Sequence, residues 1–189
     1  MIPRLRVFAA LLFALALAAP ALIAGPPQVP GSRQGRGVST KKDRSAEEAR
    51  QQYYAAQAAL YSALAHATAL EQLAETDEPD MDLARTYVHT INREIQASEG
   101  DSVKVGQVKH AVEKQESMKA FRKELAEAMR AIDDAQEAVD GHGSLGPHSK
   151  NATAHLLNAM IWLVRLADDV GVQPLPAPGV KALEDARKR

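Results

Sequence analysis

The feature that most constrains the fold is a heptad pattern of apolar and small residues that begins near residue 45. Up to residue 75 these residues alternate in steps of four and three, which places them along one stripe of an α-helix. The stripe consists of Ala49, Tyr53, Ala56, Leu60, Ala63, Ala67, Leu70 and Ala74. Such a stripe must be buried against partner helices, and no alternating run of β-branched residues indicates a strand. The chain is therefore expected to be all-α.

The same spacing recurs in three further segments. We expect a second helix over residues 79–98, a third over about 102–140 and a fourth over 147–169, with a glycine-rich loop at 140–150 before the last one. Their stripes are Met81, Ala84, Val88, Ile91, Ile95 and Ser98; then Met118, Phe121, Leu125, Ala128, Ile132, Ala135 and Val139; then Ala152, Leu156, Ala159, Leu163, Leu166 and Val170. The expected fold is an antiparallel bundle of four helices within residues 45–171. Because the fourth helix is apolar almost all round, it is expected to be the most enclosed member.

The unequal lengths of these helices leave two alternatives open. The third helix is about twice as long as the second, and its early valines are out of phase with the stripe that starts at Met118. Either this helix overhangs and is met by the fourth, or it breaks between Gly106 and Ser117. A homodimer formed through the overhang is a further option.

The first 24 residues are expected to be a cleaved signal peptide. Arg4 and Arg6 precede an unbroken apolar run over residues 7–19, and small residues follow it. The alternative is an uncleaved membrane anchor, since residues 7–25 carry no charge, although Pro20 and the short apolar run weigh against it. The protein is therefore expected in the periplasm or outside the cell.

Two segments of unusual composition flank the expected bundle. Residues 25–44 are rich in proline, glycine and basic side chains, which is typical of a linker. A weak contact of this linker with an anionic surface, through Arg33, Arg36, Lys41, Lys42 and Arg44, is the alternative, and a solvated linker is the simpler interpretation. Gly171 is expected to end the last helix, and residues 172–189 form a proline-rich tail with a short charged segment.

Composition excludes several functions. With 23 Lys and Arg against 24 Asp and Glu, the formal charge is −1, which gives no reason to expect a nucleic-acid partner. The absence of cysteine excludes disulfides, thiol nucleophiles and cysteine-ligated metals. The di-iron Glu-x-x-His pattern, the zinc-peptidase motif and the common nucleotide-binding and nucleophile motifs are also absent. We therefore expect a protein that is not an enzyme and that needs no cofactor.

The histidines are the residues that invite a search for a metal site. His66, His89 and His110 would lie at similar height in an antiparallel bundle, but their heptad positions place them on different faces. His142 and His148, with Asp140, form a weak candidate for Cu²⁺, Ni²⁺ or Zn²⁺ in the glycine-rich loop. A polar turn without a metal is the simpler interpretation. A b-type haem is disfavoured by the narrow, alanine-rich stripes.

Tyr54 and Tyr61 are seven residues apart and form a small aromatic stripe on the first helix. It is either a partner contact or, as the simpler interpretation, a feature of the surface. The residues together favour an exported, non-enzymatic bundle of the cell envelope that acts by protein binding, as an adaptor, chaperone-like or scaffold protein. The alternative is a periplasmic metal- or haem-binding four-helix bundle.

Overall fold

The computed structural model describes residues 41–175, with the side chains of residues 41–43 and 142 left undefined. The predicted signal peptide, most of the linker and the end of the tail lie outside this range. The described chain consists of α2 (Lys41–Ala74), α3 (Met81–Val108), α4 (His110–Glu113), α5 (Glu116–Glu137), the π-helical turn η2 (Ala138–His142) and α6 (Leu145–Val170). No strand occurs within it. The prediction of an all-α fold is confirmed.

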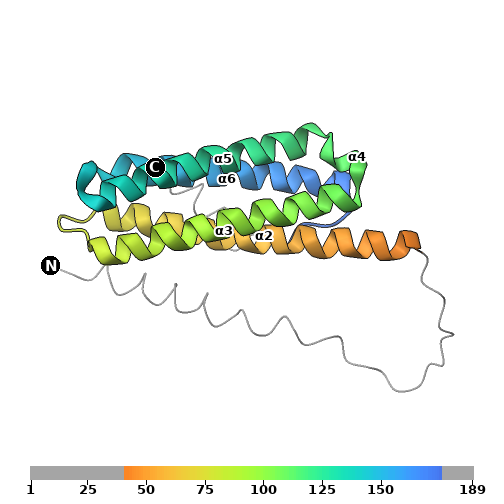
Figure 1. Cartoon of the computed structure of the whole chain (residues 1–189), viewed down its shortest axis with the longest axis horizontal. Coiled ribbons are helices and arrows are strands. Elements are labelled where there is room, and N and C mark those ends of the chain that lie inside the picture. Colours follow the sequence, from red (N-terminus) through yellow and green to blue (C-terminus); the bar gives the residue numbers. More distant parts are fainter. Residues whose placement is uncertain (1–40, 176–189) are drawn as a thin grey trace, which may run out of the picture. The chain divides into compact units, whose positions relative to one another are not determined.

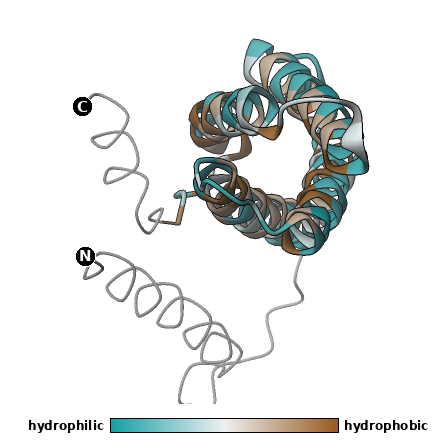
Figure 2. Cartoon of the chain, turned by 90° about the vertical axis from the view of Figure 1, so that its left-hand side faces the viewer, coloured by the Kyte–Doolittle hydropathy of each residue, from teal (hydrophilic) through white to brown (hydrophobic). Residues whose placement is uncertain are grey.

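The four long helices form an antiparallel bundle (Figure 1). Helix α2 packs against α3 and α6, and α5 packs against α6 and, less extensively, against α3. Viewed end-on, the four helices surround a common axis (Figure 2). In the described part of the chain, no helix combines the length and the hydropathy that crossing a membrane would require.

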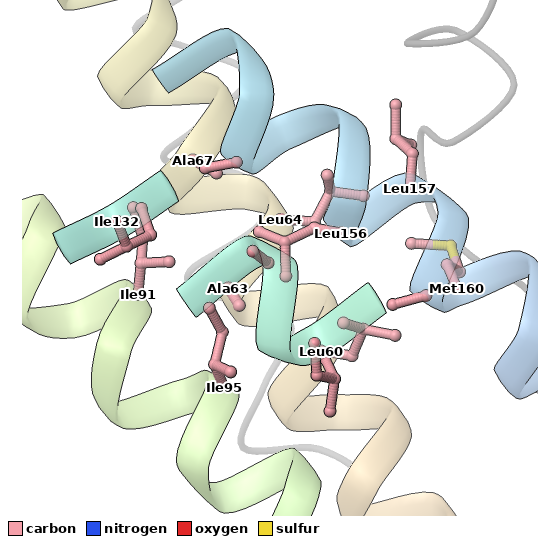
Figure 3. Close-up of a cluster of buried hydrophobic side chains, with 14 of the residues drawn as sticks. Leu60, Ala63, Leu64, Ala67, Ile91, Ile95, Ile132, Leu156, Leu157 and Met160 are labelled. Atoms are coloured by element: carbon pink, nitrogen blue, oxygen red, sulfur yellow. The ribbon is translucent and has the colours of Figure 1, made fainter. Parts of the chain in front are cut away.

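The heptad stripes form the core. Every residue of the third and fourth predicted stripes is buried, and the first and second stripes are buried except at their ends, where Ala74 and Met81 are half-buried. Leucines and isoleucines from these stripes meet between the helices at mid-bundle (Figure 3). Burial of this apolar surface, at about 25 cal/mol per Å², is what holds the bundle together.

Helix α3 runs ten residues beyond its predicted end. The second helix was expected to end at residue 98, but α3 continues through Gly100 to Val108. The reason is that Ser102 and Val105 extend the second stripe in the same alternating steps, and both are buried. Gly100 lies on the exposed face, where a residue without a side chain does not interrupt the packing. At its other end, α3 starts at Met81 because the Asp80 carboxylate caps the main-chain N–H groups of Asp82 and Leu83, at 3.1 and 3.0 Å.

The predicted third helix is broken. Lys109 and Gln115 leave the helical conformation, and the short helix α4 between them turns the chain from α3 into α5. Of the two alternatives, the break near Gly106–Ser117 is therefore correct and the overhang is wrong. The slip in phase between Val105 and Met118 marked this corner, because a straight helix could not bury both residues on one seam.

Two other expectations need correction. Helix α2 begins at Lys41, before residue 45, where the helical pattern was expected to begin. Most of the expected glycine-rich loop is helical, since η2 reaches His142 and α6 starts at Leu145. Helix α6 has more buried residues than any other helix among the described side chains, as expected for the most enclosed member. Its outer face is exposed at Ile161 and Val164, to 46% and 43%, because each helix of a four-helix ring keeps an outer face.

Candidate functional site

One side of α2, next to its buried heptad stripe, carries a row of three hydrogen-bonding side chains, Tyr54, Gln57 and Tyr61. Spacings of three and four residues place them one above another on the same side of the helix. Tyr54 and Tyr61 are half-buried, and Gln57 is fully buried. We call these three residues the tail-binding stripe.

The segment that follows α6, residues 172–175, crosses this stripe. The Tyr54 hydroxyl donates a hydrogen bond to the main-chain oxygen of Gln173 at 2.9 Å. The Tyr61 hydroxyl donates to the main-chain oxygen of Leu175 at 3.1 Å. Two phenols seven residues apart on α2 thus bind two carbonyl groups that are two residues apart on this segment.

Gln57 binds both main-chain groups of a single residue. Its Oε1 accepts a hydrogen bond from the Leu175 N–H at 3.0 Å, and its Nε2 donates to the Leu175 oxygen at 3.2 Å. The same Nε2 also donates to the Tyr61 hydroxyl at 2.8 Å. The buried amide therefore has partners for its oxygen and for both of its N–H groups, as a buried polar group requires.

Contacts at the end of α6 fix where the segment begins. Gly171 takes the left-handed conformation (φ 74°), and the N–H groups of Gly171 and Val172 bond to the Ala167 oxygen at 2.8 and 3.0 Å. The Lys109 ammonium donates to the oxygen of Val170. The Ser117 hydroxyl donates to the Asp169 carboxylate at 2.5 Å. The corner between α3 and α5 thus holds the point from which the tail leaves α6.

The tyrosine hydroxyls at this site donate hydrogen bonds to the tail. Burial raises the pKa of Tyr61, although its hydrogen bond with Gln57 partly offsets this. Tyr53, in the core beneath the stripe, also has a pKa raised by burial, and its hydroxyl donates to the oxygen of Leu163 at 3.0 Å. The rings of Tyr53 and Tyr54 meet edge-on, with centroids 5.7 Å apart. The core tyrosine therefore supports the first residue of the stripe.

The residues of the candidate metal site have other partners. Asp140 accepts a hydrogen bond from Gln136 at 2.9 Å and lies 3.5 Å from an Arg85 guanidinium nitrogen. His148 Nδ1 lies 3.7 Å from the Asp134 carboxylate. The side chain of His142 is outside the description. Among the described side chains, no three metal-ligating groups come together. A metal bound by His142, His148 and Asp140 stays a prediction.

The remaining histidines are dispersed. His89 and His110 are exposed. His66 is half-buried, with Nδ1 2.8 Å from the Ser62 oxygen and its ring 5.9 Å from that of Tyr87. His155 Nδ1 lies 2.8 Å from the Glu124 carboxylate, between α5 and α6.

The basic residues proposed to touch an anionic surface are mostly beyond the described side chains. Arg33 and Arg36 lie outside the described range, and Lys41 and Lys42 belong to the first turn of α2 without defined side chains. Arg44 is exposed. This contact stays a prediction.

Sequence reasoning identified two parts of the site but did not join them. It singled out Tyr54 and Tyr61, and it recognised an extended, proline-rich tail. It missed Gln57, which lies three residues after one tyrosine and four before the other and so completes the same stripe. The simpler interpretation of the tyrosines as a feature of the surface is wrong, because both hydroxyls bind the chain's own tail.

Comparison of the chain with protein families, with characterised proteins and with solved structures finds no match. Function must therefore be inferred from the geometry of the tail-binding stripe.

Proposed function

We propose that the protein is an exported, non-enzymatic helical bundle of the cell envelope that acts by binding other proteins, as an adaptor, chaperone-like or scaffold protein. The observation that supports this proposal is that one helix binds a separate segment of the chain through its main-chain groups. Tyr54, Gln57 and Tyr61 form hydrogen bonds with the main chain of residues 173–175. Binding an extended segment through its main chain is a recurrent way in which proteins recognise peptides.

The chemistry of the stripe favours binding over catalysis. Two neutral phenols and a carboxamide can donate and accept hydrogen bonds, but none of them is a nucleophile or a base at neutral pH. Four hydrogen bonds join the stripe to the tail, and each contributes about 0.5–1.5 kcal/mol net. Bonds of this strength suit a contact that forms and exchanges, as an adaptor requires.

Site-specific photo-cross-linking in intact cells tests the proposal. A photoreactive residue replaces Ala58, which is exposed and lies four residues after Tyr54. The control carries the same residue at His89, which is exposed on α3. We expect a defined envelope protein to be cross-linked from position 58 and not from position 89. No adduct at position 58, or the same adducts at both positions, would contradict the proposal.

A further inference from the structure

We infer that the tail-binding stripe recognises partner segments in which a non-proline residue stands between two prolines, and that residues 173–175 occupy the site as an intramolecular competitor. This inference rests on the proposed function and names the chemistry of the partner. The residues that carry it are Tyr54, Gln57 and Tyr61 on α2, and Gln173 and Leu175 on the tail.

The tail-binding stripe forms hydrogen bonds with main-chain groups of the tail and not with its side chains. It binds the oxygens of Gln173 and Leu175 and the N–H of Leu175. Leu175 is 43% exposed, and Gln173 is exposed as well, so the stripe does not enclose either side chain. Any extended segment that presents the same three groups can therefore replace the tail.

Proline explains which segments present those groups best. Pro174 and Pro176 flank Leu175 in the sequence, and proline has no main-chain N–H. Leu175 thus supplies the one N–H of this triplet, at the position where Gln57 accepts it. Flanking prolines also hold a chain extended before it binds, which reduces the conformational entropy lost on binding. A proline at the central position would remove the N–H and leave Gln57 Oε1 without this donor.

The arrangement of the tail indicates competition and not only structural support. Four hydrogen bonds join the described tail to α2, all of them to main-chain groups of residues 173 and 175. Departure of the tail would remove these bonds from Tyr54, Gln57 and Tyr61, while the bond from Gln57 to Tyr61 would remain. A second extended chain restores the lost bonds. Because the tail is tethered at Gly171, its effective concentration at the stripe is high, on the order of millimolar. A partner segment must therefore displace it.

The test uses the full chain and a fluorescent peptide that copies residues 171–179, GVQPLPAPG. The variant Leu175→Pro removes the tail's N–H and leaves α2 unchanged, whereas the matched control Leu175→Ala keeps the N–H. Fluorescence anisotropy measures binding of the peptide added in trans. We expect Leu175→Pro to bind the peptide about tenfold more tightly than the wild type and Leu175→Ala, as the loss of one such bond predicts.

Two further binding measurements test whether the gain in affinity depends on Gln57 and on the N–H group at the centre of the peptide. Adding Gln57→Ala to Leu175→Pro is expected to abolish the gain, and a peptide with proline in place of the central leucine, GVQPPPAPG, is expected to bind about tenfold more weakly. Equal binding by wild type and Leu175→Pro, or a gain that persists without Gln57, overturns the inference.

The peptide-binding experiment and the cross-linking experiment can fail independently of each other. A cross-linked partner at position 58, together with no gain in Leu175→Pro, overturns this inference and leaves the proposed function standing. A gain that depends on Gln57, without any cross-linked partner, supports the peptide site and contradicts the proposed function.

Discussion

At the residue scale, burial sets the behaviour of the tyrosines on α2. Tyr53 is fully buried, and its hydroxyl has a single acceptor, the oxygen of Leu163, at 3.0 Å. Burial disfavours the charged phenolate, so the pKa of Tyr53 is raised above its ordinary value of 10.0. The unfolded chain therefore releases this proton at a lower pH than the folded chain does.

This difference predicts a loss of stability at alkaline pH. The contribution of neutral Tyr53 is complete below pH 10 and is lost as the pH rises from 10 toward the folded-state pKa. We expect Tyr53→Phe to be less stable than the wild type at neutral pH, because the bond to Leu163 is lost, but to lose less further stability above pH 10. Denaturant unfolding at neutral and alkaline pH measures both. Equal alkaline losses in the two proteins would refute this assignment.

Two substitutions distinguish a core position from an exposed one. Leu163 is 1% exposed, and Leu163→Ala is expected to lower the free energy of unfolding by about 2–5 kcal/mol through loss of burial and the cavity left behind. His89 is exposed, and His89→Ala is expected to change it by less than about 0.5 kcal/mol. Chemical denaturation compares them. Similar losses in both variants would mean that the heptad assignment is incorrect.

At the element scale, the stripes were predictable and the helix ends were not. Steps of four and three identified a buried stripe on each of the four long helices, because burial follows the period of the helix. The second helix was expected to end before Gly100, but Ser102 and Val105 continue the second stripe, and α3 therefore runs on through Gly100. Conversely, no proline or glycine stands at Lys109, where the helix breaks, and the break was indicated by Gly106 and by the slip in phase before Met118.

Glycine substitutions test this revised boundary. Gly100 lies inside α3, and a β-carbon there would meet no atom within 4 Å. We expect Gly100→Ala to stabilise the protein by about 0.5–1 kcal/mol, since alanine is the better helix former. Gly171 has φ 74°, and Gly171→Ala is expected to destabilise it by about 1–2 kcal/mol. Thermal unfolding reports both changes, and a destabilising Gly100→Ala would show that α3 ends near residue 100.

At the scale of the whole molecule, the site arises from a contact that no local pattern contains. Leu175 and Gln57 are 118 residues apart in the sequence, and the return of α6 beside α2 brings them together. The aromatic stripe and the proline-rich tail were each visible in the sequence, but their pairing depends on the order of helices around the bundle. This is why the fold was predictable from periodicity, whereas Gln57 was found only in the structure.

The central claim is that α2 holds the tail through Gln57, and hydrogen exchange of the Leu175 amide, followed by nuclear magnetic resonance, tests it most directly. The matched control is Gln72→Ala, which removes an exposed glutamine from the same helix. We expect the Leu175 N–H to exchange slowly in the wild type and in Gln72→Ala, and about tenfold faster in Gln57→Ala, because its acceptor is gone. The same exchange rate in all three proteins would contradict the account.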